Sequence, residues 1–514
     1  MADYLMGIDL GTSGVKAAIY ASNGTVIASA TETYPLYHPQ QGWAEQNPDE
    51  WWNATCAAIH KCEQLAKIDS ASRLAGIALS GQMHGAVLLD ENYRPLRPCI
   101  IWADQRCQDE CDEITRLVGA ETLIELISNP ALPGFTAPKL LWARNHEPEI
   151  WQKVKKILLP KDYIRFKLTG EVYQEISDAA GMALLDIKSN QWSAALMHIL
   201  QFNADWFPQL IQSTEIAGYI SAAAAAETGL TAGIPIAGGG ADNACAAIGA
   251  GVVNAGSGLV SIGTSGVVLA AMDRPHIDSI LPTPRTHTFT HAAPNMWYMM
   301  SVTQAAGLSL RWARDQIYTA EAAAARQRGA DIYEMITAEA ATVPAGSHGL
   351  IFLPYLQGER TPILDSQARG GWIGLTASHS RKHLARAVLE GVAFSQRQGL
   401  DIITNSGARI EKMRITGGGA RSAVWSEILA SILGRPLYPL AAEEGPALGA
   451  AILAGVAAQI YPSVQSAVDS VVTLKDPVLP NAEWQERYAT MLEIYGSLYP
   501  EIRKAVWSLG RLLP

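Results

Sequence analysis

Residues 4–20 read YLMGIDLGTSGVKAAIY, and the tetrapeptide Gly-Thr-Ser-Gly at 11–14 recurs at 263–266, about half a chain further on. Both copies are flanked by apolar runs that are typical of β-strands, at 4–10 and 15–20 for the first and at 259–262 and 267–270 for the second. A small, glycine-flanked tip between two such runs predicts a β-hairpin. Because one hairpin lies near the start of each half, we predict two similar lobes that face each other.

The composition of these two tips suits a phosphate group. Glycine lets the backbone approach a ligand closely, free N–H groups can point at anionic oxygens, and Thr and Ser hydroxyls donate hydrogen bonds without adding charge. A single hairpin of this kind is more often only a tight turn. The repetition of this hairpin about half a chain further on favours a phosphate site that both tips share.

Length and composition limit the classes of protein to consider. The chain has 514 residues, of which 48% are hydrophobic, so it can bury more than one core and is expected to form two large domains. Charged residues make up 17% and the net charge is −10, which excludes the basic footprint of a nucleic-acid-binding protein. No apolar run approaches the roughly 20 residues that span a bilayer, and the stretch 449–460 predicts a buried helix.

The N-terminus and the cysteines indicate a cytoplasmic protein. The first strand begins almost at once and leaves no room for a signal segment. Six cysteines are sparse for this length and lack C-x-x-C spacing, so we expect reduced thiols and no metal site, even at Cys107 and Cys111, which are four residues apart.

Apolar strand candidates alternate with helical stretches along the whole chain, which predicts an α/β fold. The run 234–237 leads through Gly238-Gly239-Gly240 into a helix at 241–249. A lobe boundary is expected in the glycine-rich segment 249–257, giving domains 1–249 and 250–514. The alanine-rich patches 221–226 and 320–325 are interpreted as surface helices. The other candidates are strands at 75–79 and 156–159 and helices at 51–65 and 121–127.

Several of these segments together resemble the FGGY family of carbohydrate kinases. The matching stretches run nearly end to end: GIDLGTSG at 7–14, GWAEQ at 42–46, GFTAPKLLW at 134–142, GGWIGL at 370–375 and TGGGARS at 416–422. Within the family, SGQMHG at 80–85 and LPGFTAPK at 132–139 are most similar to the members that phosphorylate D-xylulose.

This resemblance implies a two-lobed actin/hexokinase-like ATPase fold with duplicated, ribonuclease H-like domains and with ATP and sugar in the cleft between the lobes. The N-terminal domain would carry the sugar site, the first phosphate hairpin and the base, and the C-terminal domain the second hairpin and the adenosine site. The ATP phosphates would lie between the two tips, formed by Gly11, Thr12 and Ser13 and by Gly263 and Thr264. Adenosine would rest against Gly418, Gly419 and Ser422, with Gly307 allowing close backbone approach.

Other nucleotide-binding motifs are missing from the sequence. It has no G-x-x-x-x-G-K-[ST] P-loop, no H-R-D with D-F-G, and no G-x-G-x-x-G that opens a helix after a strand. The P-loop, protein-kinase and Rossmann interpretations therefore lose their main support.

Asp242 is the candidate catalytic base. A sugar hydroxyl must lose its proton as it attacks the γ-phosphorus, and a carboxylate within hydrogen-bond reach can orient the oxygen and accept that proton. Three glycines before Asp242 suggest a helix start that faces the cleft, where the helix N-terminus favours the ionised acid. Position alone is equally consistent with an ordinary helix cap. The family match favours the base.

Asp9 is the candidate ligand for Mg²⁺. Beside the first tip, its carboxylate could hold the metal through water while the metal bridges ATP phosphates. The alternative is an aspartate at a strand end that accepts hydrogen bonds from the backbone.

Met83 and His84 are the leading candidates for sugar contacts. They follow a predicted strand in a glycine-flanked loop, where His can hydrogen-bond a polyol and Met offers an adaptable apolar wall. Core packing is the ordinary role of such a pair. Trp102, with Asp104 and Arg106, is a weaker candidate for the neighbouring wall, and Asn243 for a contact beside Asp242. Glu359 and Arg360 are interpreted as an ion-paired structural loop.

The expected activity is transfer of the γ-phosphoryl group of MgATP to the terminal hydroxyl of a small ketose, D-xylulose first. Gluconate, glycerol and another pentulose or polyol are alternative substrates. A chaperone-like or cytoskeletal ATPase would share the paired hairpins, and a sugar sensor would share the pocket. The chaperone-like or cytoskeletal ATPase would need an extra domain or a polymerising surface. The presence of Asp242 disfavours the sugar sensor, which would have lost the base. We expect no nucleic-acid or membrane partner, and the oligomeric state stays open, with a homodimer as one option.

Overall fold

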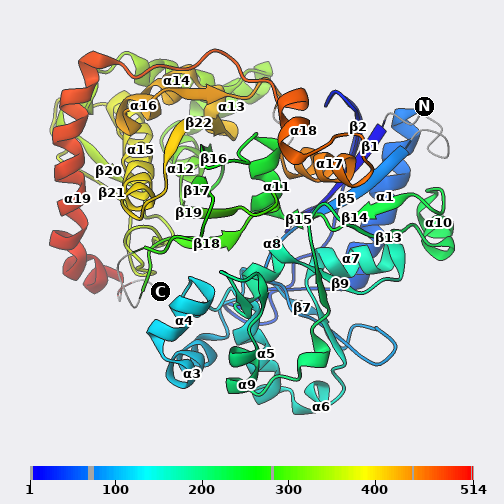
Figure 1. The fold of residues 1–514 in the computed structure, drawn as a ribbon. Helices are drawn as coiled ribbons and strands as arrows, with labels where there is room; N and C mark the ends of the chain where they lie inside the picture. The colour runs from blue at the N-terminus through cyan, green and yellow to red at the C-terminus, as the bar shows by residue number, and fades with distance from the viewer. Residues whose placement is uncertain (1–3, 68–73, 279–282, 443–444, 511, 513–514) are drawn as a thin grey trace.

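A computed structural model describes residues 4–67, 74–278, 283–442, 445–510 and 512 of the chain. It has two lobes, each built on a mixed β-sheet with flanking helices (Figure 1). The predicted two-lobed α/β fold is therefore confirmed. None of the described helices is long and apolar enough to cross a membrane.

The first sheet contains both strands of the N-terminal hairpin. Its order is β13-β14-β5-β1-β2-β3, with β15 pairing on β5. The hairpin and β3 are antiparallel, whereas β1 pairs in parallel with β5. The strands are β1 (Tyr4–Leu10), β2 (Gly14–Ala21), β3 (Val26–Thr33), β5 (Leu74–Gly81), β13 (Ile216–Tyr219), β14 (Pro235–Ala237) and β15 (Gly240–Ala241).

The second sheet repeats this arrangement. Its order is β18-β19-β17-β16-β22-β23, and β16 pairs antiparallel with β17 and parallel with β22. The second Gly-Thr-Ser-Gly copy connects β16 to β17 just as the first connects β1 to β2, so both predicted hairpins are confirmed. The strands are β16 (Gly256–Ile262), β17 (Gly266–Met272), β18 (His287–Thr290), β19 (Trp297–Thr303), β22 (Ile410–Thr416) and β23 (Leu437–Pro439).

Two helices lie between the sheets and join the lobes (Figure 1). Helix α11 (Asp242–Gly249) follows β14 and β15, and helix α17 (Gly445–Ala457) follows β23. Helix α17 packs against α11 and against β1 and β5 of the first sheet. The contact is close because it is lined by glycine: a Cβ atom at Gly449 would lie 1.9 Å from the carbonyl oxygen of Cys245.

The remaining helices cover the outer faces of the sheets. The first sheet is flanked by α1 (Pro48–Ala66), α7 (Pro160–Thr169) and α10 (Ala222–Thr228). The second lobe carries α12 (Gly307–Gln316), α13 (Thr319–Arg328), α14 (Ile332–Ala341), α15 (Arg381–Asn405), α16 (Ala423–Leu433) and α19 (Ala482–Gly510), and α18 (Val464–Val471) packs on α17. The two alanine-rich patches fall in α10 and α13. Ala224 is the one buried residue in 221–226 and 320–325 has none, so both patches lie on surface helices, as predicted.

A smaller helical region extends from the first lobe (Figure 1). Its helices are α3 (Gln108–Val118), α4 (Ala120–Ile127), α5 (Thr136–His146), α6 (Pro148–Trp151), α8 (Ile176–Ala179) and α9 (Ala194–Ile199). Short strand pairs connect them: β4 (Glu45–Gln46) with β7 (Cys99–Ile100), β6 (Val87–Leu89) with β8 (Lys156–Leu158), β9 (Tyr173–Glu175) with β12 (Gln209–Ile211), and β10 (Leu185–Asp186) with β11 (Gln191–Trp192). In the second lobe, β20 (Ile351–Leu353) pairs with β21 (Gly371–Ile373).

Candidate active site

The two hairpin tips expose unpaired backbone donors. Each tip has three residues between its strands, 11–13 in the first and 263–265 in the second. In the first tip the N–H of Gly11 donates to the carbonyl oxygen of Gly14 at 3.0 Å. In the described part of the chain, no hydrogen bond is donated by the N–H groups of Thr12 and Ser13, nor by those of residues 263–265. These five groups are therefore available to anionic oxygens, as the tip sequences predicted.

The first tip is held by side chains from neighbouring loops. Trp102 donates from its indole nitrogen to Thr12 Oγ1 at 2.8 Å, and Gln46 donates to the Thr12 carbonyl oxygen at 2.7 Å. Gln82, beside the Met83–His84 pair, donates to Gln46 at 2.8 Å. The structure thus brings Trp102 to the first tip, and its place in the wall of the sugar site stays a prediction.

Helix α12 holds the second tip in a similar way. The N–H groups of Gly307 and Leu308 donate to the carbonyl oxygens of Gly263 and Thr264 at 2.8 and 3.1 Å. A Cβ atom at Gly307 would lie 2.4 Å from the Gly263 carbonyl oxygen, so glycine is required here by the tip itself. A contact between Gly307 and adenosine stays a prediction.

The candidate adenosine residues lie just after β22, in a 3₁₀ turn at Gly418–Arg421. Gly418 is exposed, and no atom lies within 4 Å of a Cβ atom built on it. Gly419 is buried and packs on Ile262, next to the second tip. Ser422 caps helix α16 by accepting a hydrogen bond from the N–H of Trp425 at 3.2 Å. The turn therefore presents an open face beside the second tip.

Asp242 is the first residue of α11, and its carboxylate is partly constrained. Its Oδ1 accepts hydrogen bonds from the N–H and the side-chain amide of Asn243, at 2.7 and 3.0 Å. Burial raises the pKa of Asp242 to about 7, and the charge of Asp9 adds to the rise, while the two Asn243 hydrogen bonds oppose it. A carboxylic acid with a pKa near neutrality is suited to exchange a proton with an alcohol.

Asp9 lies across the sheet from the turn that carries Asp242. In the strand register Asp9 is opposite Ser80 of β5, and Ser80 is opposite Gly240 of β15. Burial raises the pKa of Asp9, against the opposing effects of the Ser80 hydroxyl and the Lys16 ammonium. Its Oδ1 is buried and has no hydrogen-bond partner among the residues that the structure describes. This atom could be satisfied by a cation, directly or through water, so the residues present fit Mg²⁺.

Protein carboxylates alone do not form a metal cage at this place. Among the described residues, no group of three or more His, Cys, Asp or Glu side chains is arranged to hold a metal ion. A Mg²⁺ ion beside Asp9 would therefore take most of its ligands from phosphate oxygens and water, as is usual for this ion.

His84 is presented to the cleft in a fixed orientation. Its backbone is left-handed, with φ of 71°, and its Nδ1 lies 2.6 Å from the Gly181 carbonyl oxygen. Burial lowers the pKa of His84 to about 3, so the ring is neutral near pH 7. Because the carbonyl can only accept, Nδ1 carries the proton and Nε2 is an acceptor. Such an acceptor can bind a sugar hydroxyl.

Met83 and Asn243 bring the sugar loop and the base-bearing helix into contact. The side-chain amide of Asn243 lies 3.9 Å from Met83 Sδ, and the Tyr298 hydroxyl lies at the same distance on another side. Met83 is buried, whereas Asn243 and His84 are half-buried. The structure therefore links the Met83–His84 loop to Asp242 through Asn243, which contacts both Met83 and Asp242.

A cavity of about 330 Å³ lies between α11 and the second sheet. Its lining includes Asn243, which the sequence singled out, and Ser261 and Thr416, which it did not. Ser261 is two residues before the second tip, as Asp9 is before the first, and it pairs with Thr416 as Asp9 pairs with Ser80. The internal repeat, extended by two residues, would have indicated Ser261, whereas Thr416 is found only from the pairing of β16 with β22.

Four other residues that the sequence singled out have structural contacts. Asp104 and Arg106 form a buried ion pair, and the Arg106 guanidinium lies 3.6 Å from the centre of the Trp43 ring. The interpretation of Glu359 and Arg360 as an ion-paired structural loop stays a prediction. Their charges attract each other, since Arg360 opposes the burial that raises the pKa of Glu359, but no salt bridge joins these two described residues. The Glu359 carboxylate instead accepts from the backbone N–H groups of Gln304 and Arg360, at 2.9 and 2.7 Å.

Comparisons with known proteins cover nearly the whole chain. Residues 4–249 match the N-terminal domain of the FGGY family of carbohydrate kinases, and residues 258–458 match its C-terminal domain. The xylulose kinase of Bacillus subtilis is 37% identical over 496 residues, 96% of each chain. The gluconokinase of Bacillus subtilis is 31% identical over 500 residues, 97% of this chain and 96% of the relative.

A solved structure agrees with these sequence matches. The xylulose kinase from Rhodospirillum rubrum superposes with a TM-score of 0.88 and is 30% identical, over 98% of this chain and 99% of that one. The matched regions include both tips, the Met83–His84 loop, Asp242 and the turn at Gly418.

Proposed function

Because this chain belongs to the FGGY family of carbohydrate kinases, we propose that it transfers the γ-phosphoryl group of ATP to the terminal hydroxyl of D-xylulose. The products are D-xylulose 5-phosphate and ADP. The contact between Asn243 of α11 and Met83 of the sugar loop carries this proposal, because it joins the candidate base to the candidate sugar site. ATP as the phosphoryl donor agrees with the cytoplasmic location expected from the sequence.

Asp242 is the proposed base. It orients the attacking hydroxyl and accepts its proton late in the transfer, when the oxygen has become acidic. Its pKa of about 7 keeps a large fraction ionised at neutral pH. The ionised form is also favoured by the N-terminus of α11, where the residue lies.

The two tips are the proposed phosphate site. Thr12 and Ser13 from one lobe and Thr264 from the other supply hydroxyls and free N–H groups on opposite sides of the triphosphate, with Gly11 and Gly263 shaping the tips. Asp9 would hold Mg²⁺, which when bound neutralises charge on the phosphate oxygens. We place adenosine against Gly418, Gly419 and Ser422.

The sugar is proposed to bind against the Met83–His84 loop. The neutral His84 ring accepts a hydrogen bond from one hydroxyl through Nε2, and the Asn243 amide reads another. Trp102, which is 39% exposed and bonded to Thr12, closes the wall toward the phosphate tip. These polar groups can select among sugars, because a buried donor or acceptor left unpaired by the wrong substrate reduces the rate by orders of magnitude.

A coupled assay of ADP release tests the substrate directly. We expect D-xylulose to give the highest kcat/KM among D-xylulose, L-xylulose, D-ribulose, L-ribulose, D-gluconate and glycerol. Gluconate is the second candidate, because the Bacillus subtilis gluconokinase is 31% identical over nearly full length. A clearly higher kcat/KM for gluconate or glycerol would overturn the xylulose assignment and leave the kinase class intact.

A further inference from the structure

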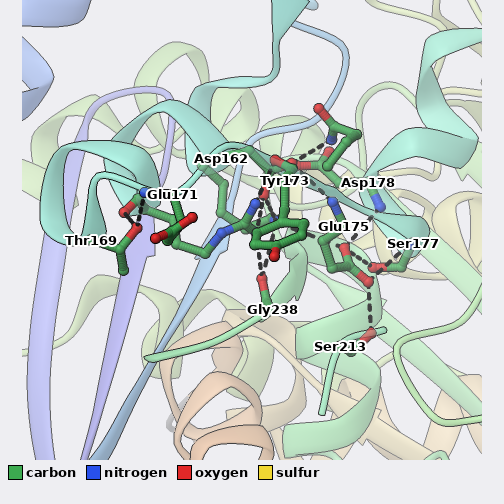
Figure 2. A network of polar contacts seen from close by, with 12 residues as sticks. Asp162, Thr169, Glu171, Tyr173, Glu175, Ser177, Asp178, Ser213 and Gly238 are labelled. Atoms are coloured by element: carbon green, nitrogen blue, oxygen red, sulfur yellow. Dashed lines mark hydrogen bonds and ion pairs between the residues drawn. The ribbon is translucent and has the colours of Figure 1, made fainter. Parts of the chain in front are cut away.

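The turn that carries Asp242 rests on a buried network of polar side chains (Figure 2). The network is formed by residues of α7, of the segment 174–178 and of the loop after β12, and none of its side chains is more than 3% exposed. Its members are Lys161, Asp162, Arg165, Gln174, Glu175, Ser177, Asp178 and Ser213. Nothing in the proposed chemistry uses these residues directly.

Glu175 is the centre of this network. Its Oε1 accepts from the Ser213 hydroxyl at 2.6 Å and from the Ser177 N–H at 2.9 Å. Its Oε2 accepts from the Ser177 hydroxyl at 2.8 Å and from the Asp178 N–H at 3.1 Å. With four donors the carboxylate is saturated, so its position and that of its donors are mutually fixed.

Ser177 connects Glu175 to the catalytic turn. An ionised carboxylate can only accept, so the Ser177 hydroxyl proton must point at Glu175. The Ser177 oxygen is then left as an acceptor, and it binds the N–H of Ala241 at 3.0 Å. Ala241 immediately precedes Asp242, and its own side chain provides no cap for α11.

The other end of the turn is held by the same network. The Gly238 carbonyl oxygen accepts from Arg165 at 3.0 Å and from Lys161 at 3.4 Å. The Gly239 N–H donates to the Ser213 carbonyl oxygen at 3.1 Å. The turn is therefore held at its first two glycines and at Ala241, which follows the third, whereas three glycines alone would leave it flexible.

The charges of the network balance when Asp178 is neutral. Burial raises the pKa of Asp178 well above its usual range. Burial alone would lower the pKa of Lys161, but the carboxylates of Asp162, Glu175 and Asp178 together raise it. Two cations, Lys161 and Arg165, then face two anions, Asp162 and Glu175, as a stable buried network requires.

The segment that holds Ser177 also contacts the sugar loop. Four residues after Ser177, the Gly181 carbonyl oxygen accepts the proton of His84 Nδ1 at 2.6 Å. A Cβ atom at Gly181 would lie 2.7 Å from that ring and 2.9 Å from Met83 Cε. One short segment therefore contacts the base-bearing turn at one end and the sugar-binding loop at the other.

From this geometry we propose that Ser177, oriented by Glu175, is a positioning residue that sets the distance between Asp242 and the bound sugar. The proposal rests on the proposed role of Asp242 in phosphoryl transfer. A misplacement of a catalytic group by about 1 Å can cost a factor of roughly 10² in rate, so the effect of losing Ser177 should appear in kcat.

The test compares Ser177→Ala with Ser213→Ala, using whichever sugar the wild-type protein phosphorylates best. Both variants remove a buried hydroxyl that donates to Glu175, but the Ser213 side chain makes no hydrogen bond to the turn among the described residues. We expect kcat to fall about tenfold or more in Ser177→Ala, with KM for the sugar within about threefold of wild type. In Ser213→Ala, kcat should change less than about threefold.

Hydrogen exchange gives a readout that does not depend on activity. The peptide containing Ala241 should exchange faster in Ser177→Ala than in wild type, because the Ala241 N–H has lost its acceptor, and should change less in Ser213→Ala. Equal losses of kcat in the two variants, a change in KM alone, or unchanged exchange at Ala241 would overturn the proposal. Failure of the proposed function is distinct: the wild-type protein would then phosphorylate none of the sugars.

Discussion

At the scale of single residues, the site depends on two buried carboxylates, and the charge of one raises the proton affinity of the other. Asp9 of β1 is aligned through Ser80 of β5 with Gly240 of β15, two residues before Asp242. The pKa of each is raised mainly by burial, and the charge of Asp9 adds to the rise at Asp242. Such repulsion is relieved when a cation binds nearby or when one acid takes up a proton, and phosphoryl transfer needs both events.

Asp242→Asn should lose activity and gain stability. The folded-state pKa of about 7 lies above the ordinary value of 3.8, so the stability linked to this group is complete below about pH 4 and is lost as the pH rises through 7. The Asn side chain does not ionise, so the variant does not lose this stability as the pH rises. We expect kcat to fall by roughly 10²–10⁴, while the free energy of unfolding at pH 8 rises by about 2 kcal/mol.

Steady-state assays and thermal unfolding at pH 5.5 and pH 8 check both halves of this expectation. The gain in Tm should be larger at pH 8 than at pH 5.5. A variant that is inactive because it is unfolded would show a lower Tm at both values. Wild-type activity in Asp242→Asn would rule out the base.

The pH dependence of kcat/KM should report the same two acids. At subsaturating substrates this ratio reflects the free enzyme, so activity should fall as the pH drops below about 7 and Asp242 becomes protonated. Asp9→Asn removes the negative charge that raises the pKa of Asp242. The acidic limb of its residual activity should therefore move to lower pH, and a limb that stayed in place or moved upward would contradict the electrostatic coupling.

At the scale of elements, the sequence predicted the hairpins well because their signal is local. The tips at 11–14 and 263–266 and the alternation around them are enough to predict strand, turn and strand, and the structure has both. Ser177 and Glu175 could not be found in this way. Their role depends on contacts with Ala241 and Ser213, which are 64 and 38 residues away and belong to other elements.

The crossing of α11 and α17 gives a test at this scale. Gly449→Ala would place a Cβ atom 1.9 Å from the Cys245 carbonyl oxygen, so the helices must separate. Overpacking of this kind costs typically about 1–3 kcal/mol, and we expect a lower Tm and a lower kcat, because α11 carries Asp242.

Gly371→Ala is the matched control for this substitution. It makes the same chemical change at a glycine whose added Cβ atom would have no atom within 4 Å. Its Tm should stay close to that of the wild type. Equal shifts in the two variants would mean that the close helix crossing is not the cause.

At the scale of the whole molecule, the two lobes are copies that have diverged where the chemistry is. The strand pairings of β1, β2 and β5 recur in β16, β17 and β22, yet the position of Asp9 is occupied by Ser261 and that of Ser80 by Thr416. At the first of these positions the first lobe thus has an acid where the second lobe has a neutral hydroxyl group. A nucleotide held between the tips would have Asp9 on one side of its phosphates and Ser261 on the other, so a Mg²⁺ ion held by Asp9 would lie toward the first lobe.

Binding of one triphosphate by both tips requires the lobes to approach each other during the reaction. Small-angle scattering can detect that movement. Donors on both tips can bind one triphosphate only when the cleft is closed, and closure also excludes the water that would hydrolyse ATP. The glycine-rich connection at 249–258, where Gly251 and Gly256 have positive φ, is the proposed hinge. We expect the radius of gyration to decrease with D-xylulose and a nonhydrolysable ATP analogue together, and less with the sugar alone. An unchanged radius with both ligands bound, verified by calorimetry on the same sample, would show that the tips do not close on the nucleotide.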